Sequence, residues 1–329
     1  MNRKSFYFII SLSLLAGVIG WLPNPGASCA YAQALVIDHT SVEEFHRIPE
    51  YWIEQAKQLL IQVVGESHSS QVKGGLNLVE GSHPQFSQVQ FGNLAFPPSE
   101  VGALRVLTVM HVSSGGRQGY VGEQHYWSNE NARTNMSEYT MQYADSLGLT
   151  LHLSVWLFCV DVIRRNYCWN EDNTERITFN DERMAAYLNA IKRFNDNVLP
   201  TRHVYVTAVT DDPNDTYINE DGYRVTQYNE RIRQAAITNN GILFDHADIE
   251  NWNSTSTERR IDIWNGNTLH LRHHEYDGDY LSTHATQALS IRKTKAFWVM
   301  LAKVAGWEGS PSVGARPESP SNLRIIQDP

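Results

Sequence analysis

The segment that decides the fold is residues 60–70, LIQVVGESHSS. Its first five residues form a short apolar run, which is typical of a strand that is covered on both faces of a sheet. The glycine at position 65 and the polar residues after it then predict a tight turn. We therefore expect the first strand of the domain to end here, with Ser67 just past its carboxyl end.

Strand-like and helix-like segments alternate along the rest of the chain. Further strands are expected at residues 104–112, 151–160, 204–209 and 242–244. Helices are expected at residues 49–60, 129–147, 181–197, 223–239 and 286–304. This alternation predicts an α/β fold, a three-layer α/β/α sandwich with a mainly parallel central sheet. In such sheets ligands bind at the carboxyl ends of the strands, which is where Ser67 falls.

The N-terminus has the pattern of a signal peptide. A basic Asn2-Arg3-Lys4 precedes an apolar stretch at residues 6–22, and Ala30-Tyr31-Ala32 gives an A-x-A cleavage pattern. We expect a signal peptide at 1–32, cleaved after Ala32, and hence a secreted or periplasmic protein without a membrane partner. A lipoprotein anchored through Cys29 and an uncleaved N-terminal anchor are the alternatives.

Composition describes a globular chain and argues against a nucleic-acid partner. The 329 residues carry a net charge of −9, with 42% hydrophobic and 19% charged residues. No run of lysine and arginine offers the basic stripe that nucleic acid requires. We expect one domain at residues 33–307, followed by a Pro/Ser-rich tail or linker at 308–329.

Two cysteines remain after the predicted cleavage. Cys159 and Cys168 are nine positions apart and can close a small loop in an oxidising compartment. Two separate buried thiols are the alternative.

The serine in this turn and a histidine late in the chain are candidates for acyl-transfer chemistry. A nucleophilic serine needs an exposed Oγ on a strand-to-helix turn and backbone N–H groups near the developing oxyanion. Its base is an imidazole oriented by a carboxylate. His284, just before the last expected helix, and Asp279, upstream of it, are the candidates, with Asp277 and Glu275 as other possible acids. A serine in such a turn is also a common helix N-cap.

Residues 270–284 are rich in side chains that can bind metals. A metal-dependent hydrolase built on the histidines and aspartates of residues 270–284 is an alternative, although their flanking residues indicate a loop. The acidic loops at 211–215 and 219–222 do not have EF-hand spacing. We expect neither a metal ion nor another cofactor.

The arrangement resembles the SGNH/GDSL-like hydrolase superfamily, specifically a group of secreted bacterial members. The resemblance covers roughly residues 48–307, and the matching stretches are 48–57, 65–71, 154–159, 243–250 and 284 with 295–307. It implies the SGNH, flavodoxin-like sandwich, with Ser67 as nucleophile and His284 as base. Gly122 takes the place of the family's oxyanion glycine.

Two positions depart from the family pattern. Leu281 stands where the family has its aspartate, three residues before the histidine, so Asp279 must supply the acid. Val160-Asp161 follows Cys159 where an oxyanion asparagine is expected. The sequence thus predicts an exported serine esterase acting on a small-molecule or carbohydrate ester. The alternative is a catalytically inactive SGNH scaffold that serves as a surface or carbohydrate-binding protein.

Overall fold

The segment at residues 60–65 forms strand β2 (Leu60–Gly65), which is buried along its whole length. The computed structural model describes residues 33–65, 68–92, 102–108, 125–128, 138, 140–158, 162, 167–169, 176–196, 200–210, 218–277 and 286–309. Within them β2 lies in a seven-stranded sheet of order β1-β9-β8-β5-β2-β4-β3. The six other strands are β1 (Leu35–Ile37), β3 (Gln88–Phe91), β4 (Leu104–Leu107), β5 (Leu153–Leu157), β8 (Arg202–Val206) and β9 (Ile242–Phe244).

Every pairing in this sheet is parallel, as the alternation of segments predicts. In β8, Val204 and Val206 point into one hydrophobic core, whereas Tyr205 points into another on the opposite face. Since successive side chains of a strand face opposite sides of the sheet, both faces must be covered by helices.

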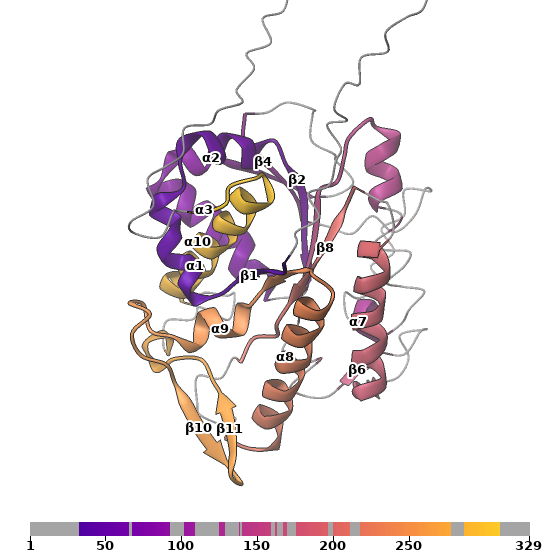
Figure 1. The fold of residues 1–329 in the computed structure, drawn as a ribbon, viewed down its shortest axis with the longest axis vertical. Coiled ribbons are helices and arrows are strands. Elements are labelled where there is room, and N and C mark those ends of the chain that lie inside the picture. The colour runs from indigo at the N-terminus through magenta and orange to yellow at the C-terminus, as the bar shows by residue number, and fades with distance from the viewer. Residues whose placement is uncertain are drawn as a thin grey trace, which may run out of the picture. The chain divides into compact units, whose positions relative to one another are not determined.

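Helices cover the two faces and give the predicted three-layer α/β/α sandwich (Figure 1). One layer contains α1 (His39–Glu44), α2 (Glu50–Lys57), α3 (Ser69–Ser82) and α10 (Gln287–Val304). The other contains α4 (His125–Ser128), α7 (Asp181–Asp196) and α8 (Glu220–Thr238). Helix α10 is largely buried and packs against α1, α2 and α3.

Three of the expected strands, at 104–112, 151–160 and 204–209, are shorter in the structure, and β1 and β3 of the central sheet were not predicted. The expected strand at 104–112 ends at Leu107, with residues 109–112 outside the described part. The expected strand at 151–160 is confirmed over Leu153–Leu157. Strand β1 precedes β2 in the chain, so β2 is not the first strand. The helix expected at 49–60 ends at Lys57, and of the helix expected at 129–147 the described residues 138 and 140–146 are helical.

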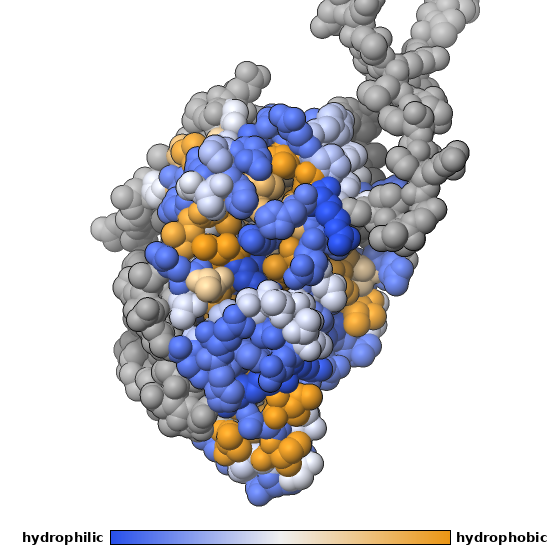
Figure 2. Space-filling view, turned by 90° about the vertical axis from the view of Figure 1, so that its left-hand side faces the viewer, coloured by the Kyte–Doolittle hydropathy of each residue, from blue (hydrophilic) through white to orange (hydrophobic). Residues whose placement is uncertain are grey.

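The remaining elements are short. They are η1 (Phe45–Arg47), η2 (Pro84–Phe86), β6 (Tyr167–Trp169), β7 (Arg176–Thr178), α9 (His246–Asn251), β10 (Ile261–Trp264), β11 (Asn267–His270) and η3 (His274–Tyr276). The antiparallel hairpin β10–β11 lies at the lower end of the views and presents apolar side chains there (Figure 2). Ile261 and Ile263 on its outer face are 52% and 61% exposed.

Several predictions fall outside the described residues: the signal peptide at 1–32, Cys159 of the expected disulfide, and residues 310–329 of the tail. In the part of the chain that the structure covers, the helices fall short of the length and apolarity that a bilayer crossing demands.

Candidate functional site

The turn after β2 is shaped by Gly65. Its φ of +127° is a backbone conformation that side-chain-bearing residues rarely adopt, and a Cβ atom added there would lie 2.2 Å from the carbonyl oxygen of Leu157. The glycine therefore allows β2 to approach β5 closely where both strands end. The predicted nucleophile Ser67 lies outside the described residues, two positions after Gly65 and two before Ser69, where α3 begins.

The serine that follows Ser67 most closely in the described chain has a structural role. Ser69 is fully buried, and its Oγ donates a 2.8 Å hydrogen bond to the backbone oxygen of Gly65. This bond closes the strand-to-helix turn on itself. The Ser69 hydroxyl is thus engaged in a hydrogen bond with the backbone of the turn.

His284, Asp279 and Gly122 also lie outside the described residues. His284 is two positions before Thr286, the N-cap of α10, whose Oγ1 accepts a 3.1 Å hydrogen bond from the backbone N–H of Leu289. The structure therefore shows the helix that follows each candidate, α3 after Ser67 and α10 after His284, but it does not show the candidates in contact.

These two helices cross closely. A Cβ atom added to Gly75 of α3 would lie 2.6 Å from the backbone oxygen of Ser290 and 2.1 Å from Thr294 Oγ1. Such spacing leaves no room for a side chain, so a glycine at this position sets how near α10 comes to α3.

A buried polar network lies where α3, α9 and α10 meet. Lys293 Nζ of α10 donates hydrogen bonds of 2.6 Å to Gln71 Oε1 and to Glu250 Oε2. Glu250 Oε1 accepts hydrogen bonds from the backbone N–H of Thr210 and, at 2.8 Å, from its Oγ1. The Lys293 and Glu250 side chains are 0% and 1% exposed. The sequence analysis did not assign a role to any of these residues.

Two buried histidines accompany this network. His68 directly follows Ser67 in the chain, and His246 is the first residue of α9. The Nε2 atom of His246 has no hydrogen-bond partner among the described residues. Burial lowers the pKa of His246 well below its usual value, and the nearby charges of Lys293 and His68 lower it further. His246 is therefore neutral at physiological pH.

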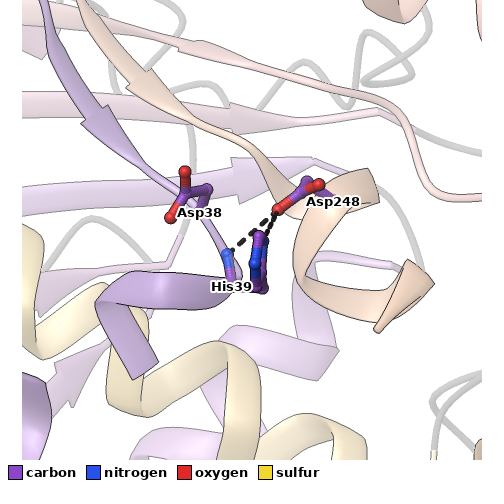
Figure 3. A group of neighbouring side chains, drawn as sticks. All are labelled: Asp38, His39 and Asp248. Carbon is purple, nitrogen blue, oxygen red and sulfur yellow. Dashed lines mark hydrogen bonds and ion pairs between the residues drawn. The ribbon is translucent and has the colours of Figure 1, made fainter. Parts of the chain in front are cut away.

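A second polar cluster lies at the carboxyl ends of β1 and β9 (Figure 3). Its members are Asp38, His39 and Asp248, which offer metal-ligating atoms within 4.8 Å of one another. Asp248 Oδ2 accepts hydrogen bonds from the backbone N–H of His39 at 3.1 Å and lies 2.5 Å from its Nδ1. The His39 ring stacks on Trp252, with ring centroids 4.1 Å apart and planes inclined by 15°.

The hydrogen bonds of this cluster indicate a structural role, and they do not favour a metal site. Asp38 Oδ1 caps helix α1 by accepting from the backbone N–H of Thr40, at 2.9 Å. Asp248 is held by two donors of His39, so a cation would have to displace these bonds. The sheet order places β1 four strands from β2, about 19 Å at the usual strand spacing. His39 is thus too distant to act as the base for a nucleophile that follows β2.

The described histidines of residues 270–284 do not converge. His270 contacts Arg259, and the His273 ring accepts a hydrogen bond from the backbone N–H of Glu275. His274 Nδ1 lies 2.9 Å from Asp277 Oδ2. These separate partners weaken the alternative of a metal-dependent hydrolase.

Both alternative acids are engaged elsewhere. Asp277 is held by His274 and, at 3.2 Å, by Arg272. A carboxylate oxygen of Glu275 accepts a 2.8 Å hydrogen bond from the backbone N–H of Ser254. Each would have to exchange these partners in order to orient His284.

Comparison of the chain with protein-family models gives no match, and comparison with curated proteins gives none either.

Proposed function

We propose that the chain is an exported serine ester hydrolase of the SGNH type, acting on a small-molecule or carbohydrate ester. The observation that carries the proposal is the turn at Gly65. A tight turn from a central parallel strand into a helix is the setting in which a serine hydroxyl is presented to substrate. In the sequence Ser67 lies midway between Gly65, the last residue of β2, and Ser69, the first residue of α3. Ligands of α/β proteins bind beyond the carboxyl ends of such strands, which supports the proposal.

In this proposal Ser67 Oγ attacks the ester carbonyl carbon while His284 accepts the hydroxyl proton. Asp279 orients the imidazole, and backbone N–H groups at Gly122 and at the start of α3 stabilise the oxyanion. His284 then gives its proton to the leaving alcohol, and an acyl-enzyme remains. A water molecule, deprotonated by His284, attacks the acyl group, so that the acid leaves and the serine is restored.

Hydrolysis of 4-nitrophenyl acetate and of acetylated sugars by the mature protein tests the proposal. Ser67→Ala should reduce kcat at least about a thousandfold, because the nucleophile is removed. Ser70→Ala, a matched change at the second residue of α3, should leave the rate within about twofold. Equal rates for wild type and Ser67→Ala would refute the assignment of the nucleophile.

A catalytically inactive scaffold that binds carbohydrate is the second candidate. It is favoured by Leu281 at the position of the family's aspartate and by Val160-Asp161 in place of its asparagine. Calorimetry with acetylated and deacetylated oligosaccharides separates the two. Binding without turnover supports the scaffold, and turnover that depends on Ser67 supports the esterase.

A further inference from the structure

Among the ion pairs of the described residues, one is almost completely removed from solvent. Lys293 of α10 and Glu250 of α9 are 0% and 1% exposed, and their Nζ and Oε2 atoms are 2.6 Å apart. Further hydrogen bonds of the pair reach Gln71, in the first turn of α3, and Thr210, which follows β8. The ion pair between α9 and α10 is thus connected to the start of α3 and to the segment that follows β8.

Stability alone does not account for this pair. Moving two charges out of water costs so much that well-packed apolar replacements of similar volume are often as stable or more so. Breaking such a pair by removing one partner, in contrast, leaves an uncompensated buried charge. What an ion pair provides and an apolar pair does not is direction, since each hydrogen bond has a fixed length and angle.

Two of the elements that the pair joins directly follow the candidate residues in the chain. Gln71 is four residues after Ser67 and belongs to the helix whose first turn supplies backbone N–H groups. Lys293 is nine residues after His284, on the helix that follows it. Glu250 is on the helix that follows β9, and Thr210 follows β8. Figure 1 shows α3 and α10 side by side in one layer.

We propose that Lys293 and Glu250 are positioning residues, which hold the start of α3 in register with α10 so that the serine turn keeps its reactive geometry. The inference rests on the proposed function of Ser67. Neither residue is assigned contact with the substrate. Lys293 and Glu250 act on the start of α3 through the hydrogen bond to Gln71. A displacement of about 1 Å there can lower the rate by a factor of about a hundred.

The test replaces the pair without leaving a buried charge. In the double variant Lys293→Met with Glu250→Gln, methionine has nearly the length of lysine, and glutamine can still accept a hydrogen bond from Thr210. We expect kcat for 4-nitrophenyl acetate to fall at least about tenfold with KM within about twofold. Hydrogen exchange at the backbone amides of residues 69–73 should become faster, because the anchor of Gln71 is lost.

Val299→Ala is the matched control. Val299 is a fully buried residue of α10 in the core cluster, six residues beyond Lys293, and its truncation weakens the same helix without touching the network. We expect it to lower the melting temperature while kcat and exchange at 69–73 stay near the wild-type values. If it reduces kcat as much as the double variant does, the network has no positioning role of its own.

Further outcomes decide the proposal. Unchanged kcat in the folded double variant, or unchanged exchange at residues 69–73, overturns it. If the double variant does not fold, Gln71→Met, which removes the link to α3 and keeps the ion pair, takes its place with the same expected results. If the wild type has no esterase activity, the proposed function fails, and the exchange measurement still decides whether the pair fixes the start of α3.

Discussion

Replacement of His203 should remove a large part of the acid sensitivity of the fold. His203 lies in β8, is 1% exposed and packs on Phe194 with ring centroids 4.6 Å apart. Neither of its ring nitrogens has a hydrogen-bond partner among the described residues. Burial lowers its pKa to about 3, so the ring is neutral in the folded protein at pH 5 and above.

The size of the effect follows from the difference in pKa between the two states. The unfolded chain binds a proton at His203 below about pH 6.5, whereas the folded chain does not until about pH 3. The free energy of unfolding therefore falls as the pH is lowered through this window, by about 1.4 kcal/mol per pH unit. At pH 5 the contribution of His203 is about 2 kcal/mol.

Urea unfolding of wild type and His203→Leu at pH 7 and pH 5 measures this contribution. Leucine has a similar volume and no titratable group, so the wild type should lose about 2 kcal/mol more stability than the variant on acidification. His246 titrates in both proteins and cancels in the difference. An equal loss in the two proteins would refute the conclusion that His203 stays neutral in the fold.

Three further substitutions test two close glycine contacts and one buried ion pair. Gly65→Ala should lower the free energy of unfolding by more than about 1 kcal/mol and slow any esterase activity, because the new Cβ collides with a carbonyl oxygen of β5; unchanged stability and rate in denaturation and kinetic assays would contradict this. Arg233→Met should lower the free energy of unfolding by about 3–5 kcal/mol, since Asp245, which accepts two hydrogen bonds from the guanidinium, would keep a buried charge without this cationic partner. A urea midpoint equal to that of the wild type would contradict this prediction. Gly75→Val should destabilise the fold by about 1–3 kcal/mol by forcing α3 away from α10, and a melting temperature equal to that of the wild type would argue against the close crossing.

The central strands could be predicted from the sequence because they are covered on both faces. β2 and β5 are apolar runs with buried neighbours on either side, so periodicity and composition agree. β1 and β3 were missed for the opposite reason. Each has only three or four residues at an edge of the sheet. β1 is an apolar run of just three residues, and β3 has glutamine at two of its four positions, so neither gives a long apolar signal.

The sequence of the hairpin β10–β11 carries a clear turn signal. Asn265-Gly266 between alternating apolar residues is a typical two-residue hairpin turn. The structure places these two residues at φ values of +48° and +76°, as that turn requires. Recognising it would have placed His270 at a strand end and not within a loop of metal ligands.

The polar clusters could not be predicted, since their members are far apart in the chain. Asp38 and Asp248 meet only because β1 pairs with β9, and Gln71 meets Lys293 only because α3 crosses α10. The one local indication was Lys293 itself, a charged residue within the apolar face of a helix. A charge in that position is rarely buried unless it has a partner.

Labelling with a fluorophosphonate probe shows whether Ser67 is an activated nucleophile. The probe phosphonylates an activated serine with loss of fluoride. We predict that the mature wild type and the Ser70→Ala control are labelled at a similar rate, and that Ser67→Ala and His284→Ala are not labelled. A folded wild type that the probe does not modify would contradict the claim and favour the catalytically inactive scaffold.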